Sequence, residues 1–296
     1  MTAPQEQVNA YFQSRSSYWK DIYTSGGVQG EIYRDRQAAV LAWIDSLALA
    51  PGSKVLEIGC GAGFMAVALA ERGFHVYAID STEEMVKLAR QHAAESGHAT
   101  QISLDVGDVY ALNFEDGFFD LVMALGVIPW LERVERAIQE MARVIRPGGY
   151  LILTADNRAR LIYLLDPLVN PALKPLRKSV KGVLERLGFP HWFSNKINST
   201  LHDSCFIDGT LARAELVKMR GMTLGFGPFS FLHRRVLPEP LGTAIHRRLQ
   251  RLADRNIPVF RSTGTQYLVL ARKAVPRPLA QSTSGEKLVS NITSAP

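Results

Sequence analysis

Short apolar segments alternate with amphipathic segments between residues 54 and 155. This alternation predicts strands separated by helices, which build βαβ units around a parallel sheet. The predicted strands are Lys54–Ile58, His75–Ile79, Gln101–Val106, Phe119–Ala124 and Tyr150–Ala155. Apolar positions at helical spacing predict helices over Gln5–Asp21, Glu31–Leu47, Met65–Arg72, Glu83–Ser96 and Leu131–Val144. A turn at Pro147–Gly149 is expected to end the last helix and to reverse the chain into the fifth strand.

The pattern is looser after residue 157. Pro167, Pro171 and Pro175 interrupt a helical segment within residues 158–207, which is predicted to be an insert or lid. The sequence then predicts, in order, a helix at Gly209–Arg220, a strand at Met222–Phe231, a basic helix at Leu241–Asp254 and a strand at Thr265–Ala271. The two strands suit an antiparallel hairpin at the sheet edge, which gives an α/β fold with a doubly wound, mostly parallel sheet of seven strands.

Five regions follow from these elements. They are an N-terminal helical cap (1–48), an α/β core (49–157), the helical insert (158–207), the end of the core with the closing hairpin (208–274) and a polar, disordered tail (275–296).

The first predicted strand ends in a turn with glycine at every second position, Gly59, Gly61 and Gly63. Such a turn needs backbone conformations that only glycine adopts cheaply, and it lets a ligand touch the backbone. The helix that follows offers free N–H groups to an anion. A dinucleotide-binding fingerprint would place a glycine at position 64, where this chain has Phe64. A plain glycine-rich turn is the alternative.

An acidic residue follows each of the next two strands. Asp80 stands seventeen residues after Gly63, where an acid can accept hydrogen bonds from both hydroxyls of a ribose. Its alternative role is to cap the next helix, which Ser81 or Thr82 would fill equally well. Asp108 follows the third strand within Gly107-Asp108-Val109.

These segments together resemble the class I (Rossmann-like) S-adenosylmethionine-dependent methyltransferases of small molecules. The glycine turn with Glu57 resembles motif I of that class, and Ile145–Gly149 resembles its Arg-Pro-Gly-Gly turn. The resemblance covers roughly residues 30–157. It implies S-adenosyl-L-methionine as the cofactor, with contacts from Arg36, Glu57, Gly59, Cys60, Gly61, Gly63, Asp80, Ser81, Asp108, Val109, Leu125 and Gly126.

In that class an arginine before the first strand binds the methionine carboxylate, which suggests Arg36, although a solvated helix face explains it too. The aromatic side chains of Tyr11, Tyr18, Trp19 and Tyr23 could form a lid near the sulfonium or could pack in the core.

A sulfonium is already a reactive methyl donor, so a general base is needed only where the acceptor must lose a proton. His191 and His202, in the insert, are the candidates for such a base, and an ordinary surface position is the alternative for each.

Charge divides the chain. Residues 1–157 hold 12 Lys and Arg against 20 Asp and Glu (−8), and residues 158–296 hold 22 against 8 (+14). A basic half suggests an anionic partner or surface. The segment 173–187 has apolar residues on one face and basic residues mainly on the other, so it predicts either peripheral membrane contact or a lid helix packed on the core.

Cysteine usage bounds the chemistry and the compartment. Cys60 and Cys205 are the only two cysteines, which gives no disulfide framework and favours the cytoplasm. No spacing typical of metal ligands is present, so no metal is expected.

The predicted function is transfer of a methyl group from S-adenosylmethionine to an oxygen, in preference to carbon or nitrogen, of a small apolar metabolite. One alternative is a nucleic-acid methyltransferase, which the basic residues favour. Enzymes that methylate base amines carry (D/N)-P-P-(Y/F) after the fourth strand, whereas this chain has Gly126–Trp130. The other alternative is a binding protein that keeps the cofactor site without catalysis.

Overall fold

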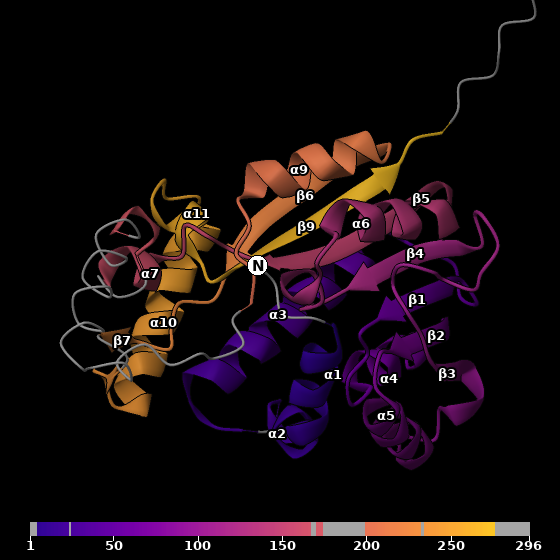
Figure 1. Ribbon diagram of the computed structural model, residues 1–296, viewed down its shortest axis with the longest axis horizontal. Coiled ribbons are helices and arrows are strands. Elements are labelled where there is room, and N and C mark those ends of the chain that lie inside the picture. The colour runs from indigo at the N-terminus through magenta and orange to yellow at the C-terminus, as the bar shows by residue number, and fades with distance from the viewer. Residues whose placement is uncertain (1–4, 24, 167–169, 174–198, 232–233, 276–296) are drawn as a thin grey trace, which may run out of the picture.

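The computed structural model describes residues 5–23, 25–166, 170–173, 199–231 and 234–275. Seven strands form one sheet in the order β3-β2-β1-β4-β5-β9-β6, with helices on both faces (Figure 1). Strands β1 (Lys54–Ile58), β2 (His75–Asp80), β3 (Ile102–Val106), β4 (Phe119–Ala124) and β5 (Ile145–Asp156) pair in parallel. Strands β9 (Gln266–Lys273) and β6 (Leu216–Leu224) close the sheet in antiparallel register. The seven-stranded α/β fold predicted from the sequence is confirmed.

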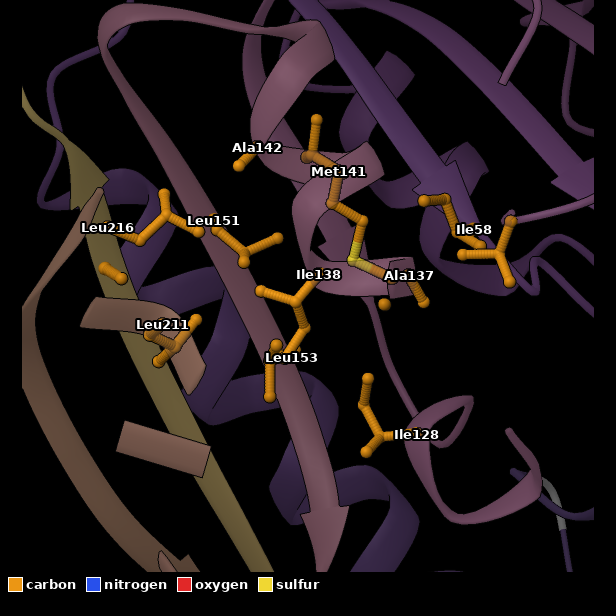
Figure 2. Packing of buried hydrophobic residues seen from close by; sticks show 14 of the residues in the cluster. Ile58, Ile128, Ala137, Ile138, Met141, Ala142, Leu151, Leu153, Leu211 and Leu216 are labelled. Atoms are coloured by element: carbon orange, nitrogen blue, oxygen red, sulfur yellow. The ribbon is translucent and has the colours of Figure 1, made fainter. Parts of the chain in front are cut away.

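Side chains of alternate residues in the central strands pack into two separate hydrophobic cores, one on each face of the sheet. Leu56 of β1 packs with α6 (Val134–Val144) and α9 (Ser204–Arg213) on one face. Its neighbour Val55 packs with α3 (Gly27–Asp45), α4 (Phe64–Ala70) and α5 (Glu83–Glu95) on the other. Because both faces are covered, the strands read as nearly continuous apolar runs in the sequence. Figure 2 shows Ile138 and Met141 of α6 above Leu151 and Leu153 of β5.

The N-terminal cap contains three helices where the sequence predicts two. α1 (Gln5–Ser14) and α2 (Ser16–Asp21) replace one long helix, and α3 begins four residues earlier than predicted. All three lie on the α4–α5 side of the sheet (Figure 1). The cap therefore approaches the sheet on the face that carries the glycine turn's helix.

Three boundaries were predicted wrongly. The Pro147–Gly149 turn lies inside β5, where Phe119 pairs with Ile145 and Leu121 with Tyr150, so the strand holds an irregularity rather than starting after a turn. Helix α6 begins at Val134, after a 3₁₀ turn at Ile128–Trp130.

The third error concerns the segment that follows α9. The predicted helix 209–220 ends at residue 213, and the residues after Glu215, which has φ +59°, form edge strand β6. Lys, Met and Arg favour helices, but pairing with β9 overrides that preference. The predicted strand 222–231 leaves the sheet after Leu224. Gly225 adopts φ +83°, and a side chain there would collide with Ile32 of α3.

The insert is described only in part. α7 (Leu161–Leu165) and a 3₁₀ turn (Pro171–Leu173) are present, whereas most of the predicted helix 173–187 and nearly all of the tail lie outside the described residues. α10 (Glu239–Asp254) confirms the predicted basic helix and precedes the short α11 (Phe260–Thr263). A two-stranded ribbon joins β7 (Ser230–Phe231) to β8 (Arg234–Arg235). Within the described part of the chain, no helix is long and apolar enough to cross a membrane.

The core on the α6 face generates a stability prediction. Ile138 is fully buried among the side chains that Figure 2 shows, whereas Gln139 beside it is exposed. We expect Ile138→Ala to lower the free energy of unfolding by about 2–5 kcal/mol through lost apolar burial and the cavity left behind. Gln139→Ala should change it by less than about 0.5 kcal/mol. Urea unfolding of both variants checks this, and equal effects would contradict the assignment of this face.

Candidate active site

One cavity of about 550 Å³ lies at the carboxyl edge of the sheet, where the strand order reverses between β1 and β4. Open α/β sheets bind ligands at this position, because the loops after the two strands run in opposite directions. Loops that follow β1, β2, β3 and β4 line the cavity together with Asp156 at the end of β5, and helices α1, α2 and α3 contribute the opposite wall. The cavity therefore joins the α/β core to the N-terminal cap.

The glycine turn has two distinct structural duties. Gly59 and Gly61 line the cavity with φ of +71° and +52°, and nothing lies within 4 Å of the place where a side chain on Gly61 would begin. A ligand can therefore touch the backbone at Gly61. Gly63 does not line the cavity. A side chain there would meet Ala89 of α5 at 3.0 Å, so this glycine allows α4 and α5 to pack closely.

Asp80, at the end of β2, lines the cavity and supports the glycine turn. Its Oδ2 accepts a hydrogen bond from the Gly61 backbone N–H at 3.0 Å, and its Oδ1 accepts one from the Thr82 N–H at 3.0 Å. Burial raises the pKa of this carboxyl above its usual value. Asp80 thus faces the cavity and supports the turn before α5, whose N-cap position is Thr82 rather than Asp80.

The remaining predicted contacts of the core lie along the same edge. Asp108 and Val109 follow β3, and Leu125 and Gly126 follow β4. The Gly126 backbone N–H is held by the Thr154 hydroxyl at 2.7 Å. Eleven of the twelve predicted cofactor residues line this one cavity, all except Gly63, namely Arg36, Glu57, Gly59, Cys60, Gly61, Asp80, Ser81, Asp108, Val109, Leu125 and Gly126.

Arg36 brings a buried positive charge from α3 into the cavity. Its side chain is 4% exposed, its guanidinium lies 4.4 Å from the ring centre of Tyr33, and Nη2 donates to the Tyr23 hydroxyl at 3.1 Å. Nε and Nη1 are buried and have no hydrogen-bond partner among the described residues. Unpaired buried N–H groups of a cation are costly, so this site suits an anionic ligand group such as a carboxylate.

Glu57, at the carboxyl-terminal part of β1, is the matching buried acid. Its side chain is 4% exposed and its Oε2 has no partner among the described residues. Burial, together with the nearby Asp80, raises the pKa of Glu57 to about 8. A ligand that carries a hydrogen-bond donor or a positive charge would satisfy this oxygen.

Aromatic side chains form much of the rest of the wall. Of the four predicted lid residues, Trp19 and Tyr23 line the cavity. Tyr11 instead stacks on Trp130, and Tyr18 is 39% exposed. Other side chains of the wall were not predicted from the sequence. They come from the cap, α4, the loop after β4, and the ends of β5 and β9: Phe12, Tyr33, Phe64, Trp130, Asp156 and Gln266.

Neither histidine candidate is placed in the cavity. His191 lies outside the described residues. His202 does not line the cavity, its ring stacks on Phe206 at 5.3 Å, and burial lowers its pKa. Its backbone N–H donates to the Asp156 carbonyl at 2.8 Å, and its ring Nε2 is buried without a hydrogen-bond partner among the described residues. A base role for either histidine therefore stays a prediction.

Among the described residues after residue 157, no Lys or Arg lines the cavity. Arg247 of α10 pairs with Glu31, and the neighbouring arginines of this helix also lie outside the cavity wall.

Comparison with known proteins agrees with this geometry. Residues 56–153 match the family model described as a methyltransferase domain. This segment is a class I methyltransferase domain. It contains β1 to β4 and most of β5, which carry the glycine turn and the acids at the strand ends.

Relatives share this domain over part of their length. A ubiquinone biosynthesis O-methyltransferase from Thiobacillus denitrificans is 35% identical over 125 residues, which cover 42% of this chain and 53% of the relative. The protein of that name from Pseudomonas aeruginosa is 35% identical over 41% of this chain and 52% of its own length. The chain thus spans about half the length of the curated relatives that it matches.

Solved structures extend the likeness of fold beyond the domain. Magnesium protoporphyrin IX methyltransferase from Synechocystis PCC 6803, solved with bound S-adenosylhomocysteine, has a TM-score of 0.60 at 21% identity over 92% of this chain and 100% of that one. A [4+2]-cyclase gives 0.61 at 15% identity over 93% and 99%. Because the same fold occurs in proteins with such different names, the chemistry of this chain must be argued from its site.

The raised pKa of Glu57 generates a prediction about pH. Between the ordinary carboxyl pKa and about 8, the folded protein holds a proton on Glu57 that the unfolded chain has released. The free energy of unfolding without ligand therefore falls as the pH rises through this window, by at most about 1.4 kcal/mol per pH unit for one proton. Urea unfolding at pH 5.5 and 7.5 should show this loss, and Glu57→Gln should reduce it. An unchanged slope in the variant would contradict the shifted pKa.

Proposed function

We propose that this chain transfers the methyl group of S-adenosylmethionine to an oxygen of a small, mainly apolar metabolite. The main supporting observation is that one cavity is lined both by Asp80, Arg36 and Glu57 and by aromatic side chains of the cap. The relatives named as O-methyltransferases support oxygen as the reacting atom.

The charged side chains that line the cavity fit the cofactor. The unpaired Nε and Nη1 of Arg36 suit its carboxylate, and the unpaired Oε2 of Glu57 suits its amino group. Asp80 stands where an acid accepts hydrogen bonds from ribose hydroxyls, and Asp108 and Val109 line the wall beyond it. Bound there, S-adenosylmethionine supplies a methyl group on a positively charged sulfur.

The chain's own contribution is to orient the acceptor and to exclude water. The cap helices place Phe12, Trp19 and Tyr33 opposite the core loops, so the cavity is walled on two sides. Placement of two reactants in a water-poor site accounts for a large part of the acceleration of a transfer between them. An apolar acceptor gains further from burial against these rings.

Removal of the Asp80 carboxylate tests the cofactor site. We expect Asp80→Ala to weaken binding of S-adenosylhomocysteine by about 1–3 kcal/mol, since buried ribose hydroxyls would lose their partner. Asp105→Ala is the matched control, because Asp105 is an exposed acid on β3 outside the cavity. Calorimetry measures both affinities, and equal affinity for the Asp80 variant and the native protein would refute this placement of the ribose.

The acceptor class is tested with methyl-labelled S-adenosylmethionine, the purified protein and an extract of its native cells. We expect the label in the organic-soluble small-molecule fraction, and much less of it when Arg36→Met replaces the native protein. Label in the nucleic-acid fraction would favour the nucleic-acid alternative. Cofactor binding without any transfer would favour the non-catalytic alternative.

A further inference from the structure

Strands β5 and β9 bring two polar side chains together at the end of the cavity that the cofactor contacts leave open. Asp156 ends β5 and Gln266 begins β9, and the two residues are direct partners in the antiparallel register. Directly opposed residues of an antiparallel pair point to the same face with Cβ atoms about 5 Å apart. Both side chains line the cavity.

The strand order places this pair away from the predicted nucleoside contacts. Asp80 and Asp108 follow β2 and β3, and Gly126 follows β4, whereas β5 and β9 are the next two strands on the far side of β4. Neighbouring strands lie about 4.8 Å apart, so the edge from β3 to β9 spans roughly 24 Å. Asp156 lies close enough to Arg36 and Tyr33 for its charge to act on both. The pair therefore lies near Arg36 and away from the predicted nucleoside contacts.

Both side chains present hydrogen-bond acceptors. The Gln266 Oε1 is buried and has no partner among the described residues. Asp156 is held by the Arg160 guanidinium at 3.0 Å and by the Ser199 hydroxyl at 2.8 Å, and both contacts are made to Oδ2. Arg160 is itself buried, at 8% exposure, and its guanidinium helps to fix the position of the Asp156 carboxylate. An orphaned acceptor next to a fixed carboxylate is unfavourable until a donor satisfies it.

We propose that Asp156 and Gln266 form the acceptor-oxygen subsite and receive the hydrogen bond of a substrate hydroxyl. The aromatic wall of Phe12, Trp19 and Tyr33 selects a flat, apolar body for that substrate, so the class is an aryl alcohol. This inference rests on the proposed function, because it names the substrate class of the same cavity. Asp156 and Gln266 act as positioning residues that aim the hydroxyl oxygen.

Two probes of nearly equal shape test the subsite, 4-ethylphenol and 4-ethyltoluene, which differ by a hydroxyl against a methyl group. Binding is measured by calorimetry on the full chain saturated with S-adenosylhomocysteine. A hydrogen bond to a charged acceptor favours the phenol, so we expect a preference of about tenfold or more in the native protein. Equal binding, tighter binding of the toluene, or binding of neither probe would overturn the proposal.

Variants connect that preference to the two residues. Gln266→Met keeps the length of the side chain and removes its polar atoms, and it should lower the preference for the phenol at least about fivefold. Asp156→Asn should do the same. Asp208→Asn is the control, because Asp208 binds the Tyr267 hydroxyl at 2.7 Å outside the cavity. An unchanged preference in a folded Gln266→Met variant would overturn the subsite even if Asp156→Asn fails to fold.

The cofactor measurement separates the two proposals. Gln266→Met should bind S-adenosylhomocysteine with the native affinity, since the Gln266 side chain is not among the predicted cofactor contacts. Labelled transfer in the extract together with no preference for the phenol would refute the subsite alone. Failure of the native chain to bind S-adenosylhomocysteine would refute the proposed function.

Discussion

Burial of the parallel sheet on both faces is the constraint on which the rest of the structure depends. Helices α6 and α9 cover one face, and α3, α4 and α5 cover the other, so most polar groups lie outside the middle of the strands. These polar groups lie where the strands end, because residues there are not engaged in the hydrogen-bond ladder of the sheet. Reversal of the strand order between β1 and β4 then opens a space at that edge, and the cap closes it.

The part of the fold between residues 54 and 144 follows from local signals. Strand β1 and strand β4 have the predicted bounds, and the glycine turn, Asp80 and Asp108 lie at strand ends as their spacing predicts. These signals are readable because a doubly buried strand is mostly apolar and because a tight ligand-binding turn demands glycine. Both properties depend on nearest neighbours in the sequence.

The features that were missed depend on contacts between distant segments. Edge strand β6 is built from residues that favour helices, and only its pairing with β9 makes it a strand. Gln266 lies in the cavity wall because the same closure of the sheet places it there, and a single glutamine at the start of a strand matches no sequence motif. Phe12 and Tyr33 lie on amphipathic helices whose inward faces read as ordinary core, so a helical pattern cannot tell a cavity wall from packed interior.

The cost of the cavity explains why its polar groups are informative. Arg36 and Glu57 are both about 4% exposed, yet each leaves buried polar atoms without a partner in the described part of the chain. Such atoms lower the stability of the free protein, and a folded chain tolerates them where a ligand satisfies them. The raised pKa of Glu57 expresses the same cost, since holding a proton removes a buried charge. A ligand with a carboxylate beside an amino group would relieve both residues together, and this shared relief is what favours an amino-acid-bearing cofactor over a plain nucleoside.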